Sequence, residues 1–128
     1  MIVDTSILVA AERGRAKLDA MLSDDDDVSM AAVTAAELWV GVDLADAKHR
    51  AKRALFVEQV LATIPAEDYD LEVARVHADL LVQMRRQGRP RGSHELLIAA
   101  TAIARDRAVV TLDRAGFEGI EGLDLRHA

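Results

Sequence analysis

The chain has 128 residues, of which 51% are hydrophobic and 30% charged, so we expect one globular domain over residues 1–128 and exclude a disordered chain. It has no cysteine, which excludes a disulfide framework, a thiol nucleophile and a cysteine-ligated zinc site. The net charge of −6 argues against a nucleic-acid partner unless basic residues are clustered, because phosphates require local positive charge.

The apolar runs are short. None approaches the roughly 18 residues that suggest a membrane span. The opening residues 1–4 also lack the basic region and long apolar run of a signal peptide. Together with the lack of cysteine, these features favour a cytoplasmic protein that does not contact a membrane.

The first half of the chain alternates short apolar runs with helical patterns. Residues 1–3 predict a buried strand, and Thr5 or Ser6 can cap a helix that runs through Ala11. Thr34 then starts a helix with a stripe of apolar residues. The remaining expected elements are a short helix over 16–22, a turn over the aspartates 24–27, a strand over 28–32, a helix over 46–62 and a brief strand at Ile64-Pro65.

The second half predicts two helices and two strands. Asp70 caps a long helix that ends at Gly88. Ser93 caps the next helix, which is apolar on nearly all sides over 96–103 and is therefore central. Strands follow over 108–112 and 123–126. Strands that alternate with helices predict an α/β fold of three layers, with a central, mostly parallel sheet flanked by helices.

Four acidic residues stand where a metal site is expected. Asp4 and Asp113 follow predicted strands, and Glu37 and Glu95 lie in the first turns of predicted helices. In open parallel sheets, sites form outside the carboxyl ends of the strands, so the four carboxylates are expected at one rim. Carboxylate oxygens suit Mg²⁺ or Mn²⁺, which activate water and stabilise the displacement of a phosphodiester oxygen.

Each acid also has a structural interpretation. Asp4 can cap the first helix, and Glu37 completes a capping-box pattern that starts at Thr34. Glu95 can stabilise its helix through the helix dipole, and Asp113 can be a turn residue.

Three further residues could take part in a site with these acids. His94 is ambiguous, because it neighbours the proposed site at Glu95, whereas a lone histidine beside a helix cap is usually structural or solvated. His77 and Trp39 are interpreted as packing residues rather than catalytic groups.

Two basic runs offset the acidic average, residues 48–53 and 85–91. The second surrounds Gly88 and Pro90, which predicts a loop, and a loop can direct several arginines at a phosphate backbone. The alternative for either run is an ordinary solvated face. The candidate RNA contacts are Arg85, Arg86, Arg89 and Arg91.

Four segments resemble the sequences of PIN-domain proteins. In chain order they are Met1-Ile2-Val3-Asp4-Thr5-Ser6, Glu37-Leu38-Trp39-Val40-Gly41, residues 92–102, and Val110-Thr111-Leu112-Asp113 with Phe117. Any one of them is a weak signal. Their order and spacing within 128 residues resemble the VapC-type toxins of bacterial toxin–antitoxin pairs.

The resemblance implies a metal-dependent endoribonuclease that cuts RNA, often transfer RNA, with Mg²⁺ or Mn²⁺. It also implies a homodimer that is held inactive by a VapB-type antitoxin. By matched position, the metal-binding and catalytic residues are Asp4, Glu37, Glu95 and Asp113, and the hydroxyls that support them by hydrogen bonds are Thr5, Ser6 and Thr111. One position departs from the family, since the third acid is normally Asp and here is Glu95, one methylene longer.

Two other acidic-site families fit the sequence less well. A phosphatase of the haloacid-dehalogenase type needs a second aspartate two residues after the first, where this chain has Ser6. A receiver domain needs an acidic pair and a central phosphorylated aspartate, and neither is visible. The remaining alternative is a PIN module with a weakened site that binds RNA or an antitoxin without catalysis.

Overall fold

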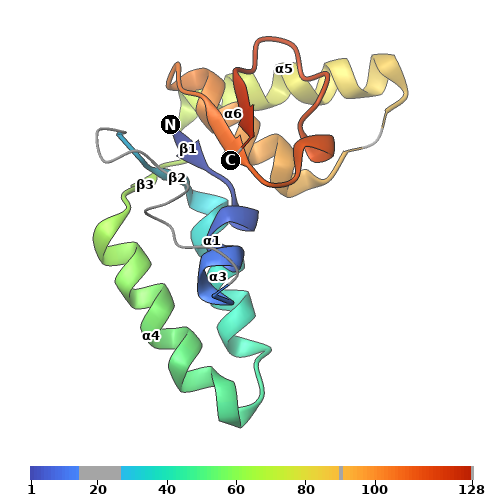
Figure 1. Ribbon diagram of the computed structural model, residues 1–128. Coiled ribbons are helices and arrows are strands. Elements are labelled where there is room, and N and C mark those ends of the chain that lie inside the picture. Colours follow the sequence, from blue (N-terminus) through green and yellow to red (C-terminus); the bar gives the residue numbers. More distant parts are fainter. Residues whose placement is uncertain (15–26, 90, 128) are drawn as a thin grey trace.

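The computed structural model describes residues 1–14, 27–89 and 91–127 (Figure 1). The strands are β1 (Ile2–Val3), β2 (Met30–Ala31), β3 (Ala66–Glu67), β4 (Val109–Thr111) and β5 (Leu125–His127). The helices are α1 (Thr5–Glu12), α3 (Ala32–Asp43), α4 (Ala47–Thr63), α5 (Leu71–Gln87) and α6 (Ser93–Ala104), and η1 (Arg114–Gly116) is a 3₁₀ turn. The predicted helix over 16–22 and most of the predicted aspartate turn lie outside the described residues.

The strands pair in parallel. β1, β4 and β5 form one sheet in the order β1-β4-β5, and β2 pairs with β3. A parallel bridge from Ile2 to Ser29 joins the two parts, because the Val3 amide donates to the Ser29 carbonyl at 3.0 Å. The order across the molecule is therefore β3-β2-β1-β4-β5, and the predicted parallel sheet is confirmed. The chain changes direction across the sheet at β1 and β4, which is where sites form in such folds.

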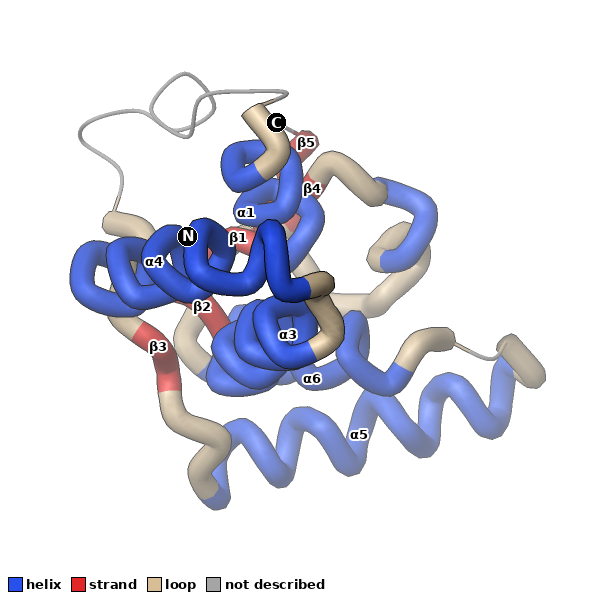
Figure 2. Tube along the Cα trace, turned by 90° about the horizontal axis from the view of Figure 1, so that it is seen from below, coloured by secondary structure: helices blue, strands red, loops and turns tan. Residues whose placement is uncertain are grey.

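Alternate residues of the central strands face opposite layers. Ile2 and Val109 belong to a buried cluster with residues of α5 and α6, whereas Val3 and Val110 belong to a second cluster with residues of α1, α3 and α4. Figure 1 shows these two helical layers on either side of the strands, and Figure 2 shows α5 packed outside α6. The predicted three-layer α/β architecture is confirmed.

The predicted starts of three helices are wrong by one or two residues. Asp4, rather than Thr5 or Ser6, caps α1. Gly92 precedes α6, so Ser93 is the first helical residue rather than a cap. α3 begins at Ala32, directly after β2, which leaves Thr34 inside the helix. At α3 the physical reason is that β2 runs into the helix without a loop, so Ala31, the last residue of β2, occupies the cap position that Thr34 was expected to fill.

The other boundaries agree with the sequence to within a few residues. Asp70 caps α5 by accepting a hydrogen bond from the Val73 amide at 3.0 Å, and Gly88 ends that helix with a positive φ of 62°. Asp46, predicted as helical, is the cap of α4. β3 lies two residues after the predicted strand at Ile64-Pro65, because α4 runs through Thr63. Within the described residues, no helix is both long and apolar enough to cross a membrane.

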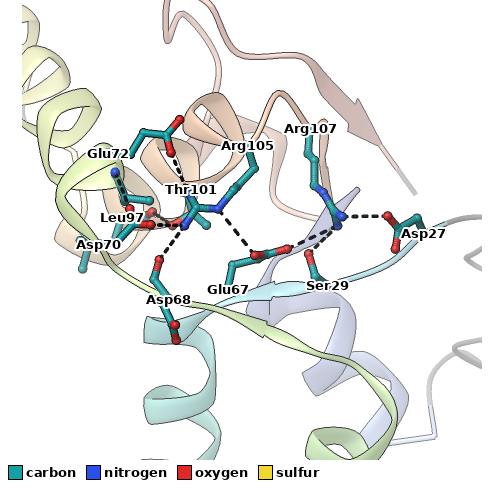
Figure 3. A network of polar contacts seen from close by, with 11 residues as sticks. Asp27, Ser29, Glu67, Asp68, Asp70, Glu72, Leu97, Thr101, Arg105 and Arg107 are labelled. Atoms are coloured by element: carbon teal, nitrogen blue, oxygen red, sulfur yellow. Dashed lines mark hydrogen bonds and ion pairs between the residues drawn. The ribbon is translucent and has the colours of Figure 1, made fainter.

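Two arginines cross-link the elements at the edge of the sheet occupied by β3 (Figure 3). Arg105, at the end of α6, donates to the Asp70 carboxylate at 2.8 Å and to the Asp68 carbonyl at 3.2 Å. Arg107, just before β4, donates to the Ser29 hydroxyl at 2.8 Å. Both arginines pair with Glu67 of β3, which fixes β3 to the segment between α6 and β4.

We expect Arg105→Met to lower the melting temperature by several degrees. The Arg105 side chain is only 20% exposed and pairs with Glu67, Asp70 and Glu72, so its loss removes three ion pairs from one partly buried group, and Glu67 keeps only Arg107 as a described cationic partner. Arg75→Met is the matched control, because Arg75 is 80% exposed and its one ion pair among the described side chains is with Asp79 on the same helix. Thermal unfolding of both variants measures the difference, and equal losses would show that the Arg105 pairs contribute no more than a surface pair.

Candidate active site

Asp4 lies between β1 and α1 and is only 5% exposed. Both of its carboxylate oxygens accept hydrogen bonds. One oxygen accepts from the amide of Ser6 at 3.1 Å and from the hydroxyl of the same residue. The other accepts from the hydroxyl of Thr111 at 2.7 Å. The structural interpretation of Asp4 as a helix cap is therefore correct, and the same carboxylate also contacts β4.

Backbone amides that donate to the hydroxyls of Ser6 and Thr111 determine where the protons of these hydroxyls point. The Ser6 hydroxyl accepts from the Leu112 amide at 3.0 Å, and the Thr111 hydroxyl accepts from the Asp113 amide at 2.8 Å. Because an amide can only donate, each hydroxyl directs its own proton to Asp4. The Asp4 carboxylate is thereby linked through two hydroxyls to the backbone that carries Asp113.

Burial is the largest influence on the Asp4 carboxyl. Desolvation raises its pKa above the usual value for an aspartate, and hydrogen bonds from Ser6 and Thr111 oppose this increase. Within residues 1–14, 27–89 and 91–127, no lysine or arginine pairs with Asp4. A buried carboxylate without a cationic partner is a group that a bound cation would stabilise.

Glu37 lies in the second turn of α3, not in the first turn as predicted. One of its oxygens accepts from the Thr5 hydroxyl at 2.9 Å, and the other lies 3.2 Å from Nδ1 of His94. The capping-box interpretation is wrong, because Thr34 is two residues inside α3 and its buried hydroxyl has no hydrogen-bond partner among the described residues. The sequence did not reveal the contact between His94 and Glu37, although the position of His94 beside Glu95 was a signal.

Glu95 and Asp113 are neighbours across a glycine. Glu95 lies in the first turn of α6, as predicted, and is half-buried. Asp113 is exposed after β4, and its side chain makes no capping hydrogen bond to η1. A Cβ placed on Gly116 would lie 3.3 Å from Cγ of Glu95 and 3.2 Å from an oxygen of Asp113. The two acidic side chains therefore meet beside Gly116.

The four acids form a linked rim rather than a closed cage. Glu37 accepts a hydrogen bond from Thr5, which directly follows Asp4 in the chain. The hydroxyl of Thr111 donates to Asp4 and accepts from the Asp113 amide, and so it connects Asp113 to Asp4. Among the described side chains, no three carboxylates or histidines converge on a point that could hold one ion. All four acids supply hard oxygen donors, and Mg²⁺ commonly uses one or two carboxylates with water in its remaining positions. The residues therefore fit a divalent cation in donor chemistry, held by few protein ligands.

The arginines before α6 are of two kinds. Arg85 and Arg86 lie in the last turn of α5, so the prediction that they belong to a loop is wrong. Arg91 donates to the carbonyls of Gly116, at 3.2 Å, and Glu118, which anchors the segment after β4. Arg89 is exposed, and its guanidinium makes no hydrogen bond or ion pair with the described part of the chain, although its amide donates to the Met84 carbonyl at 3.3 Å.

An open pocket separates these arginines from the acids. Its lining includes Arg89, Arg91, Gly92, Glu95 and Gly116. Basic and acidic groups therefore border the same hollow, beside the point where Glu95 and Asp113 meet.

Comparison with known proteins places this arrangement in a family. The model of the PIN domain family matches residues 1–123. "Ribonuclease VapC" of Rickettsia bellii is 32% identical over 98% of this chain and 93% of its own length. "tRNA(fMet)-specific endonuclease VapC" of Shigella flexneri is 30% identical over 73% of this chain and 70% of its own length. The crystal structure of VapBC-5, a member of the VapBC family of toxin–antitoxin systems from Mycobacterium tuberculosis, is 32% identical with a TM-score of 0.80, over 99% of this chain and 97% of that one.

We expect Asp4→Asn to raise the melting temperature at neutral pH in metal-free buffer, although it removes a site residue. The raised pKa means that the folded state binds the Asp4 proton more tightly than the unfolded state, so ionisation of Asp4 costs stability as the pH rises through the unfolded value of 3.8. A gain of about 1 kcal/mol would correspond to roughly 4 °C.

The pH dependence is the measurement that checks this. The difference between the two proteins should shrink as the pH falls and should vanish below 3.8, where the Asp4 carboxyl is protonated in both the folded and the unfolded state. Asp43→Asn, an exposed change of the same charge, is the control. A lower melting temperature for Asp4→Asn at every pH would contradict the expectation and would mean that the hydrogen bonds of the carboxylate outweigh its desolvation.

Proposed function

The chain belongs to the PIN-domain family, and within it to the VapC ribonucleases of toxin–antitoxin systems, and from this premise we propose that its rim of carboxylates binds Mg²⁺ or Mn²⁺ for the hydrolysis of RNA phosphodiester bonds. The observation that supports the proposal best is the buried carboxylate of Asp4, which has no basic partner within the described part of the chain and is hydrogen-bonded to the strand end that carries Asp113. The proposed metal-binding and catalytic residues are Asp4, Glu37, Glu95 and Asp113.

The surrounding hydroxyls orient these carboxylates. Ser6 and Thr111 each donate to Asp4, and Thr5 donates to Glu37. Groups that hold a ligand from behind set the direction of its remaining lone pairs, which is how an outer layer of residues tunes a metal site. When bound, a divalent cation supplies Lewis acidity and a water of lowered pKa for attack on a phosphodiester.

Several arginines border the acids and are the proposed contacts for RNA. Arg89 is exposed beside the pocket that Glu95 also lines, so its guanidinium is available to a phosphate. Arg85 and Arg86 extend the positive charge along the end of α5. Arg91 contributes indirectly, because its donors hold the segment that contains Gly116.

The partners follow from the relatives. The VapBC-5 structure is described as a member of a family of toxin–antitoxin systems, and on this ground we propose a VapB-type antitoxin as a partner of this chain. A homodimer is proposed from the sequence resemblance alone. The Shigella flexneri relative is named for tRNA(fMet), which makes transfer RNA the first substrate to test. We propose the cytoplasm as the place of action, because such substrates are found there.

The metal proposal predicts that millimolar Mn²⁺ or Mg²⁺ raises the melting temperature of the wild-type chain, because a ligand that binds only the folded state stabilises it by mass action. Asp4→Asn should remove most of this increase. The same proteins are then tested for cleavage of transfer RNA, and Asp4→Asn should reduce metal-dependent cleavage by about 100-fold or more, as expected for the loss of a metal-holding group.

The possible results separate the two functions that the sequence left open. Metal-dependent cleavage that is lost in Asp4→Asn supports the enzyme. RNA binding without cleavage in either metal would indicate a PIN module with a weakened site. A melting curve of the wild type that does not respond to either metal at neutral pH would contradict the metal site itself.

For RNA contact, we expect Arg89→Gln to weaken RNA binding and to reduce the salt dependence of binding by about one phosphate contact, a slope change of roughly 0.7 for single-stranded RNA. Arg75→Gln is the matched control, since Arg75 is an exposed arginine on α5 that pairs with Asp79. Binding is measured over a range of salt concentrations without divalent cations, so that cleavage does not interfere. An unchanged slope would mean that Arg89 is an ordinary solvated residue.

A further inference from the structure

Arg89 and Arg91 belong to the same basic run, but their side chains have different surroundings. The Arg89 guanidinium is exposed and has no hydrogen bond or ion pair with the described residues. The Arg91 guanidinium has two partners, because one terminal nitrogen donates to the Gly116 carbonyl at 3.2 Å and the other donates to the Glu118 carbonyl. Both partners are backbone oxygens, and the Glu118 carboxylate pairs with Arg114 instead.

The backbone and the guanidinium of Arg91 are both held in place. Its amide donates to the sulfur of Met84, on α5, at 3.2 Å. The guanidinium lies beside Gly119, where a Cβ would be 3.2 Å from a terminal nitrogen of Arg91. The half-buried side chain therefore ties the segment between α5 and α6 to carbonyls that lie 25 and 27 residues further along the chain.

The carbonyls that Arg91 binds belong to the turn that follows Asp113. η1 (Arg114–Gly116) begins directly after Asp113, and its last carbonyl accepts from Arg91. On the other side of Asp113, its amide donates to the Thr111 hydroxyl at 2.8 Å. The backbone at Asp113 is thus fixed from β4 on one side and, through η1, by Arg91 on the other.

The Asp113 carboxylate depends on this backbone for its position. It does not cap η1, and no hydrogen bond to it is found among the described residues. One of its oxygens lies against Gly116, where a Cβ would be only 3.2 Å away. Since Arg91 holds the carbonyl of the same glycine, a shift of η1 would move the surface on which the carboxylate rests.

Arginine is suited to holding two carbonyls, and lysine is not. A guanidinium presents five N–H donors in a rigid plane, so it can donate to two oxygens at once in fixed directions. An ammonium is a point charge at the end of a flexible chain, although it still binds phosphate well. The chemical requirement at position 91 therefore separates the two possible roles, because holding the turn requires arginine and contact with a phosphate requires only positive charge.

We propose that Arg91 is a positioning residue for Asp113, which it holds at the rim through the carbonyls of the turn after β4, rather than a contact for RNA. The inference rests on the proposed function in one respect, namely that Asp113 is a metal-binding carboxylate. It divides the basic run between Arg89, which is free to bind a phosphate, and Arg91, which supports the acids.

Arg91→Lys is the variant that tests this role, because it keeps the charge and removes the paired hydrogen bonds to the two carbonyls. It is compared with the wild type, with Asp113→Asn and with the double variant. Arg75→Lys is the control, since Arg75 is an exposed arginine on α5. Three quantities are measured, namely hydrogen exchange of the amides of residues 113–118 in EDTA, the affinity for Mn²⁺ from its stabilising effect, and kcat for cleavage of transfer RNA.

We expect Arg91→Lys to speed hydrogen exchange over residues 113–118, because the turn loses two of its restraints. It should weaken Mn²⁺ binding by about 10-fold and lower kcat by a similar factor, the usual effect of removing a group that supports a metal ligand. In the Asp113→Asn background, Arg91→Lys should weaken Mn²⁺ binding no further, because the carboxylate that it positions is absent. Arg75→Lys should behave as the wild type.

Two results would overturn the inference. If Arg91→Lys matched the wild type while Arg91→Gln reduced the salt dependence of RNA binding, Arg91 would be a phosphate contact. Equal losses of Mn²⁺ affinity from Arg91→Lys in both backgrounds would show that Arg91 does not act through Asp113. A wild type that does not respond to Mn²⁺ would contradict the proposed function instead, and hydrogen exchange in EDTA would still decide whether Arg91 holds the turn beside Asp113.

Discussion

The carboxylate of Asp4 connects the two central strands of the sheet at the edge where the site lies. It caps α1, and through the hydroxyls of Ser6 and Thr111 it is linked to the backbone that follows β4. Removing water from a carboxylate is costly, and the hydrogen bonds to Asp4 offset only part of that cost. The pKa of the Asp4 carboxyl is therefore raised, and its ionised form is less stable here than in water. The structural and functional interpretations of Asp4 are therefore not alternatives, because the same burial that makes it a good anchor makes it receptive to a cation.

Two of the other acids are tied to this anchor in different ways. Asp113 follows from it directly, because its amide is bound to the hydroxyl that donates to Asp4. Glu37 reaches the rim through Thr5, the residue after Asp4, and a histidine occupies its second oxygen. The site is thus a series of short links, each made by one hydroxyl or one histidine. Such a rim leaves several coordination positions to water and substrate, which suits a cation that must bind a phosphodiester as well as the protein.

The sequence predicted the layers, the parallel sheet and the order of the elements because these depend on periodicity and on the direction of short apolar runs. It predicted caps less well, because Asp4, Thr5 and Ser6 are all capping residues and only the backbone shows which one lies outside the helix. The capping box at Thr34 misled because β2 and α3 are continuous. The role of Arg91 as an anchor and the contact of His94 with Glu37 could not be predicted, because both depend on side-chain direction across segments far apart in sequence.

Glu95 differs from the usual aspartate of the family by one methylene, and the structure shows where the longer side chain lies. Glutamate for aspartate preserves charge and donor type, so the sequence alone raises the question of length without an answer. Two answers were open, a shifted helix or a folded side chain, and they make different demands on the neighbours. A shifted helix would disturb the buried residues of α6 that pack in the core, from Leu96 to Ala102. In the structure, one carboxylate oxygen of Glu95 lies in the space beside Gly92, so the side chain is folded back over the start of α6. The buried residues of α6 keep their places in the core with this conformation of Glu95.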